Sequence, residues 1–586
     1  MKGGMVWLIK RKPSSMPEYL SPGVYVEEFD SGLKAMEGVS TSTAGFVGMA
    51  ERGPVIGAPE FITSFADYQR KFGGYLSANA YEGNRFLPYA VEHFFLNGGS
   101  RCFVMRVAPE DAMPAQGEDA GKILSFTAAN PGAWGDKIKI AIRKSMKAKT
   151  QIIGAEGKQF ILKSTAGFVE GDIVVFNDLS DEKAKPIYNK IIKIVDRMVT
   201  FAEAFDEKTV VDTDIVPTTA LTTCDFDLSV SYDNVQEQYE KLSLNPNASN
   251  YIVKKVAKSN LVQITVNLVE DIKHPVDLIF GEETEGGKIT LEGGSDGTTT
   301  TTDASVFIGS DKGPGQRTGI ASFIENSNVS IMAVPGIVDP AVQLALVAHC
   351  ENLGSRFAVL DVPMDKVKVT DVAAHRGIMD TSYAAMYHPW IEMYDALDKK
   401  SNYMPPSGAM MGIYARSDMQ HGVHKAPANE SVRGCTGLSS LYNKAEQDIL
   451  NPQGVNLIRN IPGKGIQVWG ARTCSSDGNW KYVNVRRLFI YVEESIKANT
   501  NWAVFEPNDE VLWARVGRTI GAFLSTIWRD GALAGATEDQ AYFVNIGRDT
   551  MTQDDILNGR LICVIGIAPV RPAEFVIFRI TQKMEE

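Results

Sequence analysis

The hydrophobic positions near the start of the chain repeat with two different periods, which predict strands and helices in turn. Continuous apolar runs indicate buried strands, whereas apolar residues three or four apart indicate one face of a helix. An apolar run, two helical patterns and a second apolar run follow one another at Ala44–Ala50, Ser64–Phe72, about Tyr89–Leu96 and Cys102–Val107. Ser64 is a helix N-cap, and Asn97-Gly98-Gly99 is a C-cap. This order predicts the opening of an α/β domain.

The pattern changes to short β-type runs between about Glu110 and Gly297. Lys137–Ile142 and Leu261–Val266 are examples of these runs, and turn signals separate them. Short strands at such spacing predict a β-rich domain. A second group of small strands, at about 151–222, reads as an insertion nested within it.

The α/β pattern returns after residue 298. Two apolar strands, Ser330–Val334 and Arg356–Val362, flank an amphipathic helix between Ala341 and Leu353. Apolar strands separated by a helix predict a parallel βαβ unit that is buried on both faces. The chain therefore leaves an α/β core, forms an inserted β-rich domain and re-enters the core, which predicts an α/β (α+β) multidomain fold.

We expect the chain to divide into six successive segments. They are an N-terminal extension with a strand arm (1–43), the first part of the α/β core (44–109), the inserted β-rich domain (110–297), the second part of the core (298–420), a C-terminal domain (421–568) and a C-terminal strand arm (569–586).

A long amphipathic helix is expected at about Asp509–Arg529, with Asn508 as its cap. One apolar stripe is formed by Leu512, Val516, Ile520, Phe523 and Ile527. Arg515, Arg518 and Arg529 fall together on the opposite face. These arginines are either simply solvated or line a surface that contacts acidic groups on a partner.

Both ends of the chain carry a single β-prone run behind Pro/Gly-containing connectors. The runs are Val24, Tyr25 and Val26 at the N-terminus, and Phe575, Val576, Ile577, Phe578 and Ile580 at the C-terminus. A lone strand needs a sheet to join. Each run either pairs within its own subunit or is donated to an open sheet edge of a neighbour.

Composition narrows the classes of function. The chain has 586 residues and a formal net charge of −12, which argues against nucleic-acid binding because phosphate recognition needs a basic face. Six widely spaced cysteines predict buried, reduced thiols. The apolar run Met5–Ile9 is too short for a signal peptide or a membrane span, and either Met1 or Met16 could be the start.

The candidate catalytic and ligand-binding motifs are weak. Gly293–Gly297 fits the G-x-S-x-G pattern with Ser295 as nucleophile, but a threonine run follows where that motif needs a helix. His421 and His424 lack further metal ligands nearby. There is no phosphate-binding loop for ATP. We therefore expect no enzyme activity, no metal and no cofactor.

The stretch Gly465–Leu488 combines aromatic, glycine and charged residues without a regular period. Val468 and Trp469 suggest a strand, and Ser475–Gly478 suggests a turn. A returning strand with Trp480, Tyr482, Val483 and Val485 is expected to lead into a helix.

This stretch closely resembles the signature of contractile tail sheath proteins, the subunits that wrap the inner tube of phage tails and related injection machines. Further strings resemble the family in the family's order. They are GVSTSTAGFVG, ITSFADYQRKFGG, AVEHFFLNGGSRCFVMRV, AANPGAWGDKIKI, MPPSGAMMGIYARSD, GVHKAPANE and NPQGVN.

The resemblance implies a mechanical function. Many copies would polymerise helically around a tube in an extended state and then contract to drive the tube into a target envelope. Both terminal arms would complete sheets in adjacent subunits, and Val468, Trp469, Trp480, Tyr482 and Val483 would belong to the accepting sheet. Arg515, Arg518 and Arg529 would face the tube.

The implied partners are further copies of the chain, the inner tube protein, and baseplate and terminator proteins, with no nucleic acid and no membrane insertion. The protein would be made in the bacterial cytoplasm and found in the assembled particle. The sequence leaves open whether sister sheath proteins co-assemble with it. The alternatives are a static shell or surface-layer protein, and a modular hydrolase that uses Ser295.

Overall fold

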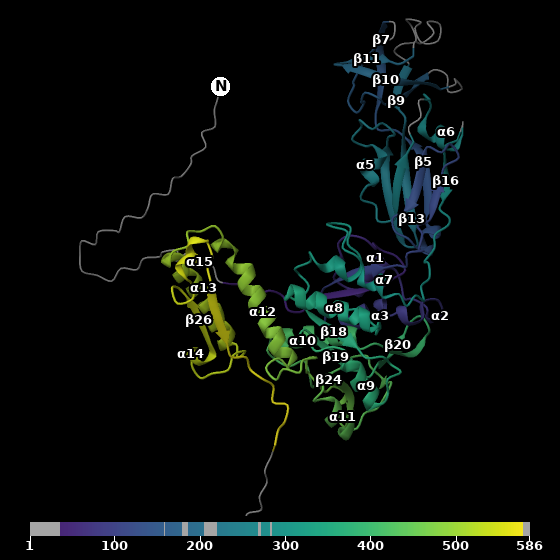
Figure 1. Ribbon diagram of the computed structural model, residues 1–586. Helices are drawn as coiled ribbons and strands as arrows, with labels where there is room; N and C mark the ends of the chain where they lie inside the picture. The colour runs from purple at the N-terminus through teal and green to yellow at the C-terminus, as the bar shows by residue number, and fades with distance from the viewer. Residues whose placement is uncertain are drawn as a thin grey trace, which may run out of the picture.

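The computed structural model describes residues 36–156, 159–178, 186–203, 219–267, 271–281 and 284–577. Three parts can be followed in Figure 1: an α/β core, a β-rich part that extends from it, and a C-terminal unit that helix α12 (Val483–Thr500) joins to the core. The predicted multidomain α/β fold is confirmed. The expected arm residues Val24, Tyr25, Val26, Phe578 and Ile580 lie outside the described residues.

A nine-stranded sheet forms the core, in the order β2-β3-β1-β17-β18-β19-β24-β25-β22. The strands are β1 (Ala44–Met49), β2 (Glu60–Ile62), β3 (Cys102–Val107), β17 (Ile331–Ala333), β18 (Phe357–Asp361), β19 (Ala384–His388), β22 (Glu430–Ser431), β24 (Val455–Ile461) and β25 (Gly465–Val468). The strands from β3 to β24 run parallel, and β2, β25 and β22 pair antiparallel at the two edges. The predicted parallel βαβ unit is therefore confirmed at β17 and β18.

Helices cover both faces of this sheet, as continuous apolar strands require. The core helices are α1 (Phe65–Phe72), α2 (Ala78–Tyr81), α3 (Leu87–Leu96), α7 (Ala304–Ile308), α8 (Pro340–Leu353), α9 (Val369–Arg376), α10 (Ser407–His421) and α11 (Lys444–Leu450). Helices α3 and α10 pack on one face and α8 on the other. A Cβ atom at Gly408 would lie 2.4 Å from the carbonyl oxygen of Ala90, so this glycine permits the close approach of α10 to α3.

The inserted part is built from small antiparallel sheets. One sheet contains β4 (Gln116–Glu118), β5 (Leu124–Ala128) and β15 (Val262–Val266), and another contains β6 (Lys139–Ser145), β13 (Asp225–Tyr232), β14 (Val235–Leu242) and β16 (Gly286–Thr290). Helices α5 (Ile252–Val256) and α6 (Pro275–Phe280) pack on them. A closed barrel at the far end contains β7 (Lys149–Glu156), β8 (Gln159–Leu162), β9 (Ile173–Asp178), β10 (Ile187–Val195), β11 (Met198–Phe201) and β12 (Thr219–Thr223). The strands of this barrel lie between Lys149 and Thr223, and its assignment as a nested insertion stays a proposal.

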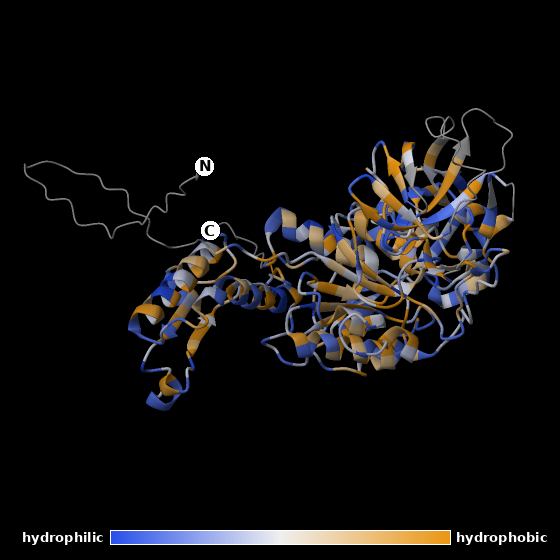
Figure 2. Cartoon of the chain, turned by 90° about the horizontal axis from the view of Figure 1, so that it is seen from above, coloured by the Kyte–Doolittle hydropathy of each residue, from blue (hydrophilic) through white to orange (hydrophobic). Residues whose placement is uncertain are grey.

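The C-terminal unit has a hydrophobic core of its own. It contains α13 (Glu510–Arg529), α14 (Glu538–Ala541), β26 (Tyr542–Ile546), α15 (Gln553–Leu557) and β27 (Cys563–Ile567). The predicted apolar stripe of α13 is buried against α12 and the β26–β27 hairpin. Figure 2 shows that this unit stands apart from the core and that its helices mix hydrophilic with hydrophobic residues.

Two details differ from the sequence expectations. Asp509, rather than Asn508, caps α13 by accepting a hydrogen bond from Leu512 N, because Asn508 Oδ1 accepts from the indole of Trp513. The core sheet also draws its last strands from residues 430–468, beyond the expected boundary at residue 420. The division into domains stays a proposal, and we place the start of the C-terminal unit at α12.

The carboxylate of Asp361, at the end of β18, is buried in this core. It accepts hydrogen bonds from Ser407 N at 2.8 Å, Ser407 Oγ at 2.7 Å and Gly336 N at 3.0 Å. Burial nevertheless raises the pKa of Asp361 to about 6. These contacts connect β18 to α10 and to the loop after β17.

The raised pKa of Asp361 predicts a specific pH dependence of stability. A carboxyl group whose pKa is higher in the folded state stabilises the fold below its unfolded pKa, and this contribution is lost as the pH rises through about 6. Between pH 4 and pH 7, the free energy of unfolding of the wild type should fall by up to about 3 kcal/mol relative to Asp361→Asn. Urea titrations at several pH values measure this difference, and parallel pH profiles of the two proteins would contradict it.

Candidate functional site

The N-terminal segment Met36–Thr43 crosses from the core sheet to helix α12. Val39 N donates to Ser495 Oγ at 3.1 Å, and Asn499 Nδ2 donates to the carbonyl oxygen of Glu37 at 2.8 Å. The segment thus lies along α12 and ends beside the C-terminal unit.

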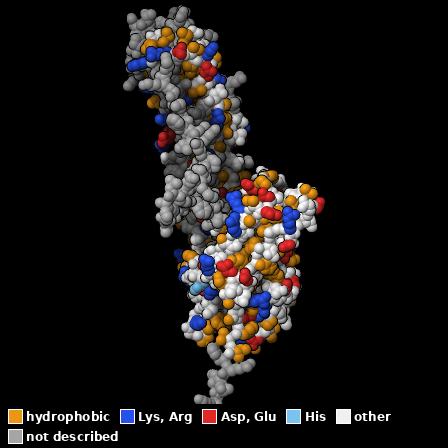
Figure 3. Space-filling model, turned by 90° about the vertical axis from the view of Figure 1, so that its left-hand side faces the viewer, with side chains coloured by type: hydrophobic (Ala, Val, Ile, Leu, Met, Phe, Trp, Pro, Cys, Tyr) orange, Lys and Arg blue, Asp and Glu red, His pale blue; other side chains and the backbone are white. Residues whose placement is uncertain are grey.

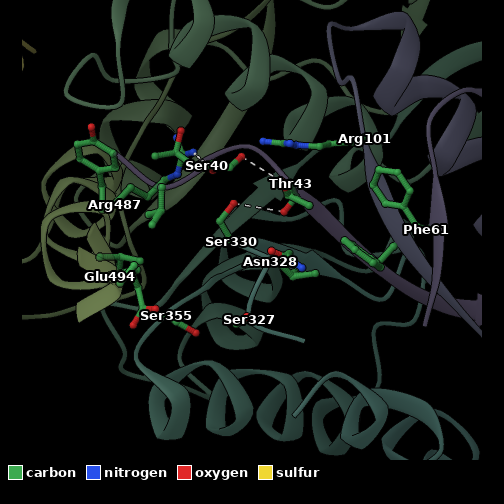
Figure 4. A pocket seen from close by; sticks show the side chains of 17 residues that line it. Ser40, Thr43, Phe61, Arg101, Ser327, Asn328, Ser330, Ser355, Arg487 and Glu494 are labelled. Atoms are coloured by element: carbon green, nitrogen blue, oxygen red, sulfur yellow. Dashed lines mark hydrogen bonds between the residues drawn. The ribbon is translucent and has the colours of Figure 1, made fainter. Parts of the chain in front are cut away.

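A cavity of about 660 Å³ lies beside this segment. Figure 4 shows Ser40, Thr43 and Ser330 on one wall, with Arg101 and Phe61 to one side and Arg487 and Glu494 to the other. The hydroxyl groups of Ser40 and Ser330 both bond to Thr43, and no histidine or cysteine is among the described residues of the lining. The cavity therefore lies at the junction of the N-terminal segment, the core sheet and α12.

A buried ion pair holds this junction together. The guanidinium of Arg487 on α12 donates to both carboxylate oxygens of Asp418 on α10, at 2.9 and 2.5 Å. The side chains are 3% and 6% exposed. Arg487 also donates to the carbonyl oxygen of Thr41, whose hydroxyl donates to Asp418 at 2.6 Å. Burial lowers the pKa of Arg487, but the ion pair with Asp418 outweighs this and raises it overall.

Aromatic side chains contact the first turn of α12. The guanidinium of Arg486 lies 3.6 Å from the ring centre of Trp480 and 4.5 Å from that of Tyr383. Trp480 also packs edge-on against Phe489. Trp480 therefore contributes to the attachment of α12.

The expected accepting sheet at Gly465–Leu488 differs in the structure. Val468 ends β25, which already pairs with β24 on one side and β22 on the other, and Trp469 follows it. Tyr482 forms a single bridge with Arg472. The expected strand through Val483 and Val485 was wrong, because both residues belong to the first turn of α12. Their β-branched side chains resemble a strand in sequence but are buried on a helix.

The expected C-terminal strand is described only in part. Phe575, Val576 and Ile577 belong to no strand and are 72%, 68% and 80% exposed. Three exposed β-prone residues in a row form an unpaired apolar surface.

The three arginines of α13 lie on its exposed face, as the helical period predicts. Arg515 stacks on Trp502 with its guanidinium 4.1 Å from the ring centre, Arg518 bonds to its own helix, and Arg529 lies 4.0 Å from Glu538.

A group of exposed apolar residues next to the exposed face of α13 was not recognised from the sequence. Phe505 is fully exposed and has a φ angle of 68°, and Val504 and Val511 are 61% and 75% exposed. A non-glycine residue with positive φ costs of order 1–3 kcal/mol and is found most often at functional sites. The sequence feature that could have indicated this group is the apolar pair Val504-Phe505 within an acidic loop.

The hairpin of β26 and β27 was also not recognised as a site. It forms a two-stranded sheet, and one face packs on α13 while Phe543 and Val564 on the other are 51% and 45% exposed. A two-stranded hairpin is only marginally stable by itself. Within the described residues no further strand pairs with its outer edges, so these edges offer backbone groups to an added strand.

The candidate catalytic and metal residues are not arranged for chemistry. Ser295 pairs through its backbone with Met113, and its hydroxyl accepts from Gly297 N, so it does not stand on a strand-to-helix turn. His421 ends α10 and His424 lies in the following loop. Within the described ranges, no three His, Cys, Asp or Glu side chains gather closely enough to hold a metal ion. In the same ranges, no helix is long and apolar enough to cross a membrane.

Comparison with known protein families gives matches over the second half of the chain. The phage tail sheath protein central domain matches residues 312–474, and the phage tail sheath C-terminal domain matches residues 475–583. The tail sheath protein of Escherichia phage P2 is 25% identical over 338 residues, which cover 56% of this chain and 81% of that protein.

Solved structures share the fold over nearly the whole chain. The sheath complex of an extracellular contractile injection system, PVC, in its contracted state has a TM-score of 0.51 at 22% identity and covers 97% of this chain and 99% of that one. The sheath tail protein of Listeria innocua has a TM-score of 0.52 at 11% identity and covers 91% of this chain and 96% of that one.

The buried ion pair predicts a large asymmetry between single and double substitutions. Arg487→Met leaves the Asp418 carboxylate buried without a counter-ion and should cost about 3–5 kcal/mol of unfolding free energy. The double variant Arg487→Met with Asp418→Leu removes both charges and should recover most of that loss. Urea unfolding of the two variants measures the difference, and an equal or greater loss in the double variant would contradict it.

Proposed function

Since this chain belongs to the contractile tail sheath family, we propose that it is a mechanical subunit of a contractile sheath. Many copies polymerise helically around an inner tube and contract to drive that tube through a target envelope. The observation that carries the proposal is the combination of exposed β-prone residues after the last helix with the hairpin of the C-terminal unit, whose outer edges carry no further strand in the described residues.

The terminal arms are donated between subunits. Phe575, Val576 and Ile577 are exposed, and an exposed β-prone segment gains backbone hydrogen bonds by joining an open sheet edge. The edges of β26 and β27 are better acceptors than β25, because β25 has partners on both sides. Head-to-tail donation of this kind does not close on itself and so builds a helical array.

The exposed face of α13 contacts the tube. Arg515, Arg518 and Arg529 present positive charge to acidic groups, and Phe505 adds an apolar anchor beside them. Figure 3 shows the side of the molecule on which the C-terminal unit lies, with basic, acidic and hydrophobic groups interspersed. This mixture favours recognition of a protein surface through a few pairs of groups.

The partners follow from this role. They are further copies of the chain, the inner tube protein, and the baseplate and terminator proteins at the two ends of the assembly. The particle forms in the bacterial cytoplasm. We assign no catalytic role to Ser295, whose hydroxyl oxygen accepts a hydrogen bond from Gly297 N in a turn that no helix follows directly.

Deletion of residues 573–586 should leave a folded, soluble subunit that does not polymerise. The deletion removes the exposed apolar segment but leaves the buried cores intact. Circular dichroism and size-exclusion chromatography check the fold and the mass, and negative-stain microscopy checks for tubes. Normal sheath formed by the truncated chain would refute arm donation.

Charge reversal on α13 should separate tube binding from self-assembly. Arg515→Glu with Arg518→Glu should reduce sheath-covered tubes at least about tenfold, because like charges across an interface repel. Lys193→Glu with Arg197→Glu on the far barrel is the matched control, since it makes the same change in net charge on exposed residues. Electron microscopy counts covered tubes. Equal coverage in both variants would exclude α13 as the tube-facing element.

A further inference from the structure

The carboxylate of Glu574 accepts four hydrogen bonds just before the exposed C-terminal segment. Arg472 donates from Nε at 2.9 Å and from Nη2 at 2.6 Å, Asn451 Nδ2 donates at 2.6 Å, and Tyr482 OH donates at 3.1 Å. A two-pronged contact between arginine and a carboxylate fixes both position and direction. The group lies in a groove of about 1210 Å³ that Trp469 also lines.

The core fixes the backbone from which these donor side chains extend. Asn451 follows α11, Arg472 follows β25 and Tyr482 precedes α12, so three elements converge on one carboxylate. The backbone of Arg472 exchanges two hydrogen bonds of 2.7 Å with the side chain of Asn456 and forms a bridge with Tyr482. The Arg472 side chain is only 11% exposed. This is a pre-organised site for a single carboxylate.

The chain before Glu574 is attached to the other part of the molecule. Val570 N donates to the carbonyl oxygen of Ala532 at 3.1 Å, and its own carbonyl oxygen accepts from Asn484 Nδ2 at 3.1 Å. Residues 570–574 therefore pass from the C-terminal unit to the core and are held at both ends. The next residue, Phe575, is 72% exposed.

We propose that Arg472, Asn451 and Tyr482 form a carboxylate-binding site for Glu574. The site makes residues 570–574 a strap between the C-terminal unit and the core, so that the arm that reaches a neighbour begins at Phe575. This inference rests on the arm donation described under the proposed function. Release of Glu574 would free residues 571–574 and lengthen the connector between neighbours by about 13 Å. The site thus sets the length of the link between subunits.

Cleavage by a glutamate-specific protease tests the site in the full-length subunit. The wild type should be cut slowly after Glu574, whereas Arg472→Gln should be cut about tenfold faster because the carboxylate loses its two-pronged partner. Tyr482→Phe removes one hydroxyl and should give a smaller increase in the cleavage rate. Such a graded response distinguishes loss of the carboxylate contacts from general unfolding of Arg472→Gln. Arg571→Gln is the matched control, since Arg571 is exposed and donates a hydrogen bond to Asn479 Oδ1.

The cleavage result has two readings. A selective increase at residue 574, with unchanged cleavage at other exposed glutamates, supports the site. Equal rates after residue 574 in the wild type, Arg472→Gln and Arg571→Gln would overturn it.

The helical geometry of assembled sheaths tests the role of the strap. Glu574→Gln keeps the arm but loses the charge, so tubes should form with a wider spread of helical pitch than wild-type tubes. Glu506→Gln, an exposed carboxylate on the loop before α13, should leave the pitch unchanged.

The outcomes separate this proposal from the proposed function. Tubes of Glu574→Gln with the wild-type pitch and spread would overturn the strap and leave the sheath function standing. Failure of the wild type to form tubes would count against the sheath function, while the protease experiment would still decide whether Glu574 is held.

Discussion

The buried ion pair between Arg487 and Asp418 joins three segments that are distant in the sequence. It connects α12 to α10 and, through Thr41, to the N-terminal segment that enters the core sheet. Two charges can be withdrawn from water only when their geometry is good and their remaining hydrogen bonds are satisfied. The direction in which α12 leaves the core is therefore tightly defined, and α12 carries the C-terminal unit with it.

Hydrophobic packing has a different role from these polar contacts. The core sheet and the C-terminal unit have separate hydrophobic clusters, and α12 contributes residues to both. Polar contacts of Arg487, Arg486 and Glu574 connect the two parts. This construction suits a subunit that moves as a nearly rigid body, because each part is stable internally and the connections between them have fixed directions.

The sheets of this protein differ in whether a further strand can join their edges. The barrel of the inserted part closes on itself, and the core sheet ends in short antiparallel strands at both edges. Such edges resist pairing with other chains. The hairpin of β26 and β27 has no further strand on its outer edges in the described part of the chain, and the exposed residues Phe575–Ile577 follow the strap that leads from its unit to the core.

Local patterns in the sequence determined much of the fold. Apolar runs placed β1, β3, β17 and β18, and the 3.6-residue period gave the buried and exposed faces of α13 correctly. The resemblance to sheath proteins, which rests on several motifs in one order, supplied the family. The start of α12 was missed because Val483 and Val485 have a strand-like local pattern, and only burial against neighbouring elements makes them helical.

The tertiary structure alone decided which groups meet. Arg487 and Asp418 lie 69 positions apart, and Arg472 and Glu574 lie 102 positions apart, so no period or spacing connects them. Sequence spacing also cannot show which sheet edge accepts an added strand, because an edge is open or paired only in relation to the strands beside it. Sequence periodicity reports which face of an element is buried, because that property is local. The partner of a polar group and the freedom of an edge depend on how the whole chain packs.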